Sequence, residues 1–142
     1  MLRKEFVRRK VKLIQEDLAK LEPLGRFSFT ELEKDWIKYA ASERYLERIV
    51  TRAIDINRHL LASLGKGNEV VREHKDTFLR LADLGIAPAA FAKTIAPSAG
   101  LRNVLVHAYD EVDPHEVYAS IGEALIQYAK YCDLILRFLK KH

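Results

Sequence analysis

The sequence has little of what builds covalent frameworks or irregular chains, with one cysteine, six glycines and four prolines among 142 residues. The lone Cys132 excludes a disulfide framework and any zinc site built on paired thiolates, and it fits a reducing cytoplasm. No apolar run reaches the roughly 18 residues that a membrane span needs, and the N-terminus lacks a signal-peptide core. We therefore expect a cytoplasmic protein with no membrane partner.

What the sequence does contain is typical of a folded domain. Hydrophobic residues make up 49% and charged residues 31% of the chain, which excludes disordered and low-complexity proteins. A chain of this length buries roughly two-thirds of its unfolded surface. We therefore expect a single domain over residues 1–142.

Positive charge is concentrated at the start of the chain. The first twelve residues have a local balance of +5 against a net charge of +4, so the remainder carries −1. The six basic residues are Arg3, Lys4, Arg8, Arg9, Lys10 and Lys12. Electrostatic attraction for phosphates would have to come mainly from this segment, although a solvated helix face is the simpler interpretation for most of these side chains.

Apolar residues recur at helical spacing along nearly the whole chain, and no segment alternates as a strand would. A first helix is predicted by the series Val7, Val11, Ile14, Leu18 and Leu21, and it ends before Pro23. Ser28 or Thr30 can cap the second helix, which meets no glycine or proline before Gly65 and can run to Leu64. The other predicted helices cover Val70–Leu84, Ala89–Ile95, Leu101–Tyr109 and Pro114–Lys140.

Punctuating residues support these boundaries. Gly65, Gly67 and Asn68 form a plausible loop, Gly85 suits a helix C-terminus, and Asp113 followed by Pro114 is typical of a helix start. The expected fold is all-α: an antiparallel helical bundle of four major helices plus a short broken helix.

The segment 101–109 carries the most chemistry. On one continuous helix, Asn103 and His107 lie four residues apart on one flank, while Arg102 and Tyr109 lie seven apart on the next. Leu101, Val104, Leu105 and Ala108 form the core-facing stripe.

These side chains suit cleavage of a phosphodiester without a metal ion or another cofactor. A guanidinium binds phosphate oxygens, and a histidine can exchange a proton with a ribose hydroxyl or a leaving oxygen. An amide and a phenol can orient either group. Spacing alone favours a structural interpretation, in which Arg102 and Tyr109 bridge helices and His107 is an interface histidine.

The motif Arg102-Asn103-x-x-x-His107-x-Tyr109 resembles the signature of the HEPN superfamily, and specifically of the HepT-like ribonuclease toxins. The segment 53–61 resembles the second-helix pattern of that family, and 78–86 resembles the stretch ahead of its active site. The similarity covers about residues 30–140.

The resemblance implies a helical bundle that forms a homodimer, with the two motif helices facing each other across an RNA-binding cleft. It implies a metal-independent ribonuclease toxin of a type VII-like toxin–antitoxin pair, acting on RNA and in some members on tRNA. Arg102 and His107 would be catalytic, Asn103 supporting, and Tyr109 the site that a minimal nucleotidyltransferase antitoxin adenylylates.

An adenylyl group on Tyr109 would lie about one residue-width from Arg102 and compete with the substrate phosphate. The acidic turn after the motif gives residues 101–123 a balance of −4, which basic side chains of the first helix or a second subunit must offset. The alternative function is a non-catalytic module, in which Arg102 and His107 only hold a nucleotide phosphate.

Other residues give weaker signals. The remaining histidines show no ligand spacing, so we expect no metal site. Trp36, Tyr39 and Tyr45 could stack on bases, but their helical spacing favours packing or a dimer surface.

Overall fold

The computed structural model describes residues 1–65, 71 and 73–142, and these form helices joined by short turns. The α-helices are α1 (Lys4–Leu21), α2 (Phe29–Lys34), α3 (Trp36–Leu64), α4 (His74–Asp83), α5 (Ala89–Ile95), α6 (Ser98–His107) and α7 (Pro114–Lys141). Two 3₁₀ turns, η1 (Glu22–Arg26) and η2 (Tyr109–Glu111), connect neighbouring helices. The described residues contain no strand, which confirms the all-α prediction.

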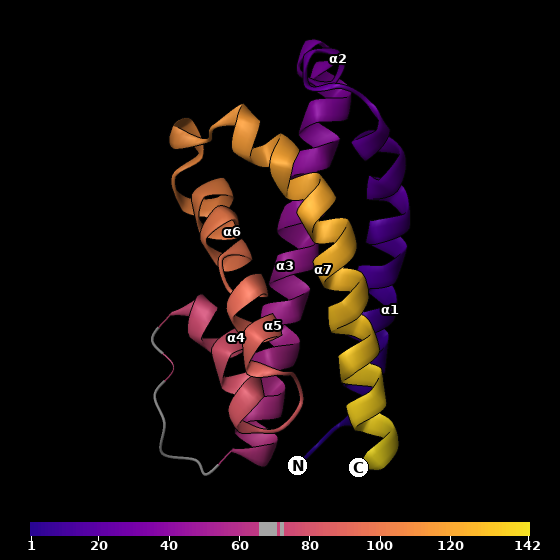
Figure 1. Cartoon of the computed structure of the whole chain (residues 1–142), viewed down its shortest axis with the longest axis vertical. Coiled ribbons are helices and arrows are strands. Elements are labelled where there is room, and N and C mark those ends of the chain that lie inside the picture. Colours follow the sequence, from indigo (N-terminus) through magenta and orange to yellow (C-terminus); the bar gives the residue numbers. More distant parts are fainter. Residues whose placement is uncertain (66–70, 72) are drawn as a thin grey trace.

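Three long helices, α1, α3 and α7, pack side by side, and the short helices α4, α5 and α6 lie on the other side of α3 (Figure 1). Both chain ends lie at the same end of the molecule. The apolar series of the first helix forms a fully inward seam, since Val7, Val11 and Ile14 are buried, as are Leu18 and Leu21. None of the described helices is long and apolar enough to cross a membrane.

A buried ion cluster fixes α1 against α3. The Asp17 carboxylate is almost fully buried and meets Nη1 of Arg52 at 2.6 Å and Nε of Arg48 at 3.1 Å. Two guanidinium partners compensate the loss of hydration of this carboxylate. The cluster therefore fixes the register of the two helices.

The second predicted helix, expected to run to Leu64, is broken at Asp35, where the chain has neither glycine nor proline. Ser28 caps α2 in a capping box with Glu31, as expected, but α2 ends at Lys34. Asp35 then caps a new helix, because its side chain accepts a hydrogen bond from the backbone amide of Lys38. The Asp35 side chain thus pairs with a backbone amide that has no partner within the helix, which allows a new helix, α3, to begin at Trp36.

The other boundaries follow the sequence more closely. Helix α5 is confirmed as Ala89–Ile95, and Gly85 after α4 has a φ of +72°, which glycine adopts without strain. Asp113 caps α7 by accepting from the amide of His115. The expected helix start at Val70 and the loop glycine Gly67 with Asn68 lie outside the described residues.

A buried polar network holds α4 against α3 and α7. The side-chain amide of Asn57 donates to Oγ1 of Thr77 at 3.1 Å, and the Tyr131 hydroxyl donates to Oδ1 of Asn57 at 2.6 Å. The hydroxyl of Thr77 donates in turn to the backbone oxygen of His74 at 2.7 Å. The start of α4, and with it His74, is thereby fixed relative to α3.

We predict that Asn57→Ala lowers the free energy of unfolding by about 1–3 kcal/mol, because it removes two buried hydrogen bonds and leaves Thr77 and Tyr131 only their bonds to the backbone oxygens of His74 and Ala53. Urea denaturation measures this loss. The matched control is Asn103→Ala, which truncates an exposed asparagine and should change the free energy by at most about 0.5 kcal/mol. Equal effects of the two substitutions would contradict the role given to the network.

Candidate active site on α6

Helix α6 packs one side against the bundle and presents the other to solvent. Its contacts are with α3, α4 and α7, and Ala99 and Leu105 are its buried residues. Leu101 packs partly against the core, as the stripe in the sequence predicted, whereas Asn103 and His107 are exposed. The polar residues of the motif therefore lie on the surface of a helix whose position is set by its apolar side.

Arg102 is half-buried and held by α3. Its Nε donates to Oγ1 of Thr51 at 3.1 Å. This bond uses the inner nitrogen of the guanidinium and does not involve the two terminal Nη groups, which are the groups that grip phosphate oxygens in pairs. Thr51 thus orients the cation without occupying its phosphate-binding edge.

A second histidine joins the motif from α4. The ring Nδ1 of His74 lies 3.2 Å from Oδ1 of Asn103. Burial lowers the pKa of His74, and so do the positive charges of Arg102, Arg58 and His107, while the bond to Asn103 acts in the opposite direction. His74 is therefore in contact with Asn103 and within the electrostatic reach of Arg102 and His107.

Nothing in the sequence marked His74 as part of the site. It lies 29 residues before Asn103, it belongs to no spaced motif, and only the packing of α4 on α3 brings it to α6. We call Arg102, Asn103, His107, His74 and Thr51 the α6 cluster.

Tyr109 differs most from its expected position. Helix α6 ends at His107, Ala108 leaves the helical conformation with φ −139° and ψ 45°, and Tyr109 begins η2. Its hydroxyl donates to Oε1 of Glu43 at 2.7 Å. The alignment of Arg102 with Tyr109 on one continuous helix is therefore wrong.

Arg102 and Tyr109 contact α3 at different positions along its axis. Arg102 contacts Thr51 and Tyr109 contacts Glu43, eight residues apart, which corresponds to about 12 Å along a helix. The two contacts are therefore much farther apart than the single residue-width expected from the sequence. Tyr109 and the α6 cluster therefore contact α3 at two separate positions along its length.

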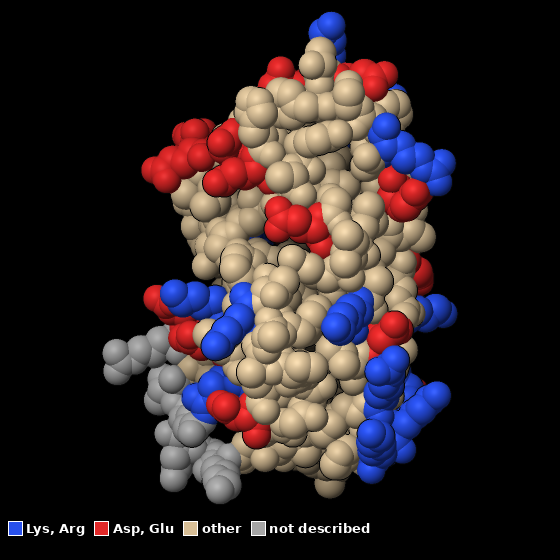
Figure 2. Space-filling view, in the orientation of Figure 1, with Lys and Arg blue, Asp and Glu red and all other residues tan. Residues whose placement is uncertain are grey.

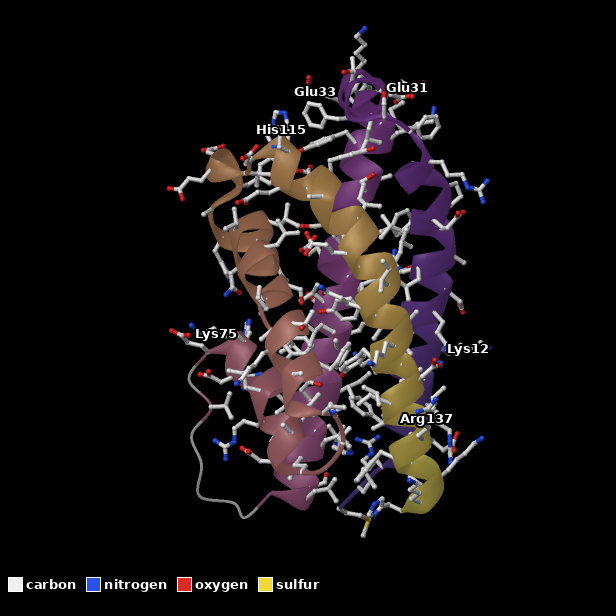
Figure 3. The ribbon with its side chains drawn as sticks, in the orientation of Figure 1. Lys12, Glu31, Glu33, Lys75, His115 and Arg137 are labelled. Carbon is white, nitrogen blue, oxygen red and sulfur yellow. The ribbon has the colours of Figure 1, made fainter. Side chains whose placement is uncertain are left out.

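The charge around α6 is also different from the expectation. Figure 2 shows acidic side chains gathered at the end of the molecule where α6 turns into α7. Helix α1 lies on the far side of α3 and α7, and Lys12 points away from α6 (Figure 3). The basic first helix therefore does not offset the acidic turn within one molecule, and among the described residues the positive charges that act on His74 of the cluster are those of Arg102, Arg58 and His107.

A pocket of about 480 Å³ opens on the side of α6 that faces α7. Leu101, Val104, Glu116 and Glu123 are among its lining residues, and neither Arg102 nor His107 is. The two glutamates make it unsuited to a phosphate group. Among the described residues, no group of three or more His, Cys, Asp or Glu side chains could hold a metal ion.

The aromatic residues of α3 divide between surface and core. Trp36 is 76% exposed, whereas Tyr39 and Tyr45 pack partly against the core. The sequence favoured packing or a dimer surface for all three; Tyr39 and Tyr45 pack, whereas Trp36 does not pack within one molecule and its place on a dimer surface stays a prediction.

Two comparisons at the level of sequence give consistent results. Residues 14–135 match the family model described as Ribonuclease HepT-like. The chain is also 35% identical over 134 residues to the tRNA nuclease HepT of Aphanizomenon flos-aquae (strain 2012/KM1/D3), a match that covers 94% of this chain and 90% of that protein.

Solved structures share the fold. A crystal structure of a toxin–antitoxin with AMP-PNP aligns with a TM-score of 0.81 at 18% identity, covering 94% of this chain and 98% of that one. The tri-AMPylated Shewanella oneidensis HEPN toxin, in complex with MNT antitoxin, aligns with a TM-score of 0.79 at 19% identity, covering 93% and 97%. With the family model spanning most of its length, the chain belongs to the HepT-like family of HEPN proteins.

Proposed function

We propose that this protein is a metal-independent ribonuclease toxin of a toxin–antitoxin pair, with tRNA as its first candidate substrate. The observation that carries the proposal is the α6 cluster, in which a guanidinium, an exposed imidazole and an amide lie at one surface. Family membership and the name of the Aphanizomenon relative support the same reaction and substrate.

In the proposed reaction the ribose 2′-oxygen attacks the adjacent phosphorus and the bond to the 5′-oxygen breaks. The 2′-hydroxyl gives its proton to a base, and the leaving 5′-oxygen takes one from an acid. His107 performs proton transfer because its ring is exposed at the end of α6. Arg102, oriented through Nε by Thr51, stabilises the charge that grows on the phosphate oxygens.

We further propose that the active form is a homodimer in which two α6 helices face each other. One His107 would then act as base and the other as acid, so that each proton has a separate carrier. The second subunit would also bring a second Arg102 to the cleft, so that two guanidinium groups are available to the RNA backbone.

We propose that a minimal nucleotidyltransferase antitoxin neutralises the protein by adenylylating Tyr109. The hydroxyl-bearing side chain is 56% exposed and lies next to the α6 cluster along α3. The attached phosphate is attracted to the guanidinium of Arg102, where it competes with RNA. Because the two anchors are about 12 Å apart along α3, this inhibition relies on the reach of the attached nucleotide.

His107→Ala should reduce RNA cleavage about 10²–10⁴-fold, because it removes a proton carrier. The assay is cleavage of tRNA in excess chelator, with circular dichroism to check that the helices persist. The matched control is His115→Ala, since His115 is an exposed histidine at the end of the bundle, near Glu31 and Glu33 (Figure 3).

The same assay distinguishes the ribonuclease from the alternative function, a non-catalytic nucleotide-binding module. A folded wild-type protein that binds nucleotide but never cuts RNA would support the non-catalytic module instead. Cleavage that is lost on adding chelator would contradict metal independence.

We expect His74 to be neutral at pH 7, because burial and the nearby cations lower its pKa below the ordinary value of 6.5. Asn103→Ala should lower the pKa of His74 further, since the hydrogen bond to Asn103 favours the protonated ring. NMR titration of the imidazole protons measures the change. A rise on this substitution would show that the contact does not act as described.

Tyr109→Phe should leave RNA cleavage largely intact but make the protein insensitive to its nucleotidyltransferase, because the phenol bonds to Glu43 and not to the α6 cluster. Mass spectrometry after incubation with the transferase and Mg-ATP detects the adenylyl group. Tyr45→Phe, which alters a half-buried tyrosine of α3, should be modified as the wild type is. Loss of cleavage in Tyr109→Phe would count against the assignment.

A further inference from the structure

The hydroxyl of Tyr109 contacts a buried carboxylate, that of Glu43. Glu43 on α3 is only 7% exposed, and its Oε1 accepts the hydrogen bond of the Tyr109 hydroxyl. Its Oε2 is buried and meets no donor at hydrogen-bonding geometry within the described residues. A carboxylate so poorly compensated is unfavourable for stability, whereas Asp17, the comparable buried acid, has two guanidinium partners.

Two phenols face this carboxylate. Tyr39 lies one turn before Glu43 on α3, and burial, the charge of Glu43 and a side-chain hydrogen bond to Glu43 together raise the pKa of Tyr39. The bond to Glu43, with burial and the same charge, raises the pKa of Tyr109. Of the two, Tyr39 is half-buried and Tyr109 is 56% exposed, so Tyr109 is the one that a nucleotide can approach.

We propose that Glu43 is the proton acceptor for adenylyl transfer to Tyr109, so that the modification site is a tyrosine–glutamate pair. This inference rests on the proposed function, in which Tyr109 receives the adenylyl group. A bond forms between Oη of Tyr109 and the α-phosphorus of ATP, the bond from that phosphorus to pyrophosphate breaks, and the Oη proton passes to Oε1 of Glu43.

The geometry explains why the proton moves within this pair. A free phenolate at Tyr109 would face the negative charge of Glu43, so ionisation before the reaction is disfavoured. The phenol already donates its hydrogen bond to Oε1 of Glu43, at an oxygen-to-oxygen distance of 2.7 Å. Transfer during the reaction therefore avoids the phenolate and leaves Glu43 neutral in its buried position.

The proposal also accounts for the unpartnered Oε2. Further hydrogen bonds to the carboxylate would stabilise its charged form and make it a weaker base. Within the described residues no donor meets Oε2 at hydrogen-bonding geometry, so this oxygen makes no such competing bond. A purely structural role for Glu43 would be served as well by a neutral acceptor.

Glu43→Gln separates these two roles, because the amide oxygen can still accept the hydrogen bond of Tyr109 but does not take up its proton. The rate of adenylylation by the partner nucleotidyltransferase with Mg-ATP should fall about 100-fold or more at pH 7. Glu47→Gln is the matched control, one turn along α3, where the carboxylate pairs with Arg44 and not with a phenol. Circular dichroism checks the fold of both variants.

The pH profile supplies a readout that a structural role would not move. Without the charge of Glu43 the pKa of Tyr109 should drop toward its ordinary value, and the modification rate of Glu43→Gln should rise about tenfold per pH unit as the phenol ionises to solvent. The ratio of wild-type to variant rates should therefore shrink with rising pH. Glu43→Asp, which keeps a carboxylate, should retain part of the rate and a pH profile like that of the wild type.

The failures are distinguishable. Adenylylation that persists in Tyr109→Phe, or a wild-type protein that is never adenylylated, overturns the proposed modification site and this inference with it. Adenylylation that is absent in Tyr109→Phe but proceeds at the wild-type rate in Glu43→Gln overturns the inference alone. A reduced rate in Glu43→Gln with a constant ratio across pH assigns Glu43 a purely structural role and also overturns it.

Discussion

The arrangement of the functional side chains depends on one continuous face of α3. Glu43, Thr51 and Arg58 fall within an arc of about 80° on this helix, and they lie beside Tyr109, Arg102 and His74 respectively. Because α3 runs unbroken from Trp36 to Leu64, the distances between these contacts are set by the rise of a helix. The proposed catalytic and modification sites therefore share one continuous helix as support, although they lie on separate elements of the chain.

Two polar clusters, together with apolar packing, hold α3 in place against its neighbouring helices. Asp17 with its two arginines sets α3 against α1, and Asn57 sets it against α4 and α7 through Thr77 and Tyr131. Hydrogen bonds and ion pairs of this kind require one register, whereas apolar packing tolerates small displacements. Side chains that must meet a phosphate to within a fraction of an ångström gain from such constraints.

The sequence was sufficient to predict what depends on local periodicity. Heptad-like spacing located α1, Ser28 with Glu31 located the start of α2, and Gly85 and Asp113 located the ends of α4 and the start of α7. It failed at Asp35 and Ala108, where the chain leaves the helix without a glycine or proline. At Asp35 the break is stabilised by a side-chain cap. Aspartate also occurs inside helices, so an aspartate in the sequence does not by itself indicate a helix boundary.

Contacts between distant parts of the chain were not predictable in the same way. His74 meets Asn103 across 29 residues and Glu43 meets Tyr109 across 66, and no spacing rule relates residues on different helices. Resemblance to a family supplied Arg102, His107 and Tyr109, because these form one short motif. It supplied neither of the partners on α3 and α4, which become visible only when the helices are packed.

The end of α6 at His107 has a consequence for how inhibition and catalysis are related. Had the helix continued, Tyr109 would lie one flank away from Arg102, and any group on the phenol would block the guanidinium directly. Because η2 instead carries Tyr109 toward Glu43, the phenol lies apart from the α6 cluster and beside a buried base. Separation leaves the unmodified site open to RNA, while the shared face of α3 keeps an attached nucleotide within the field of Arg102 and Arg58. The turn at Ala108 thus lets one short segment hold both the proposed nuclease site and the proposed modification site at separate positions.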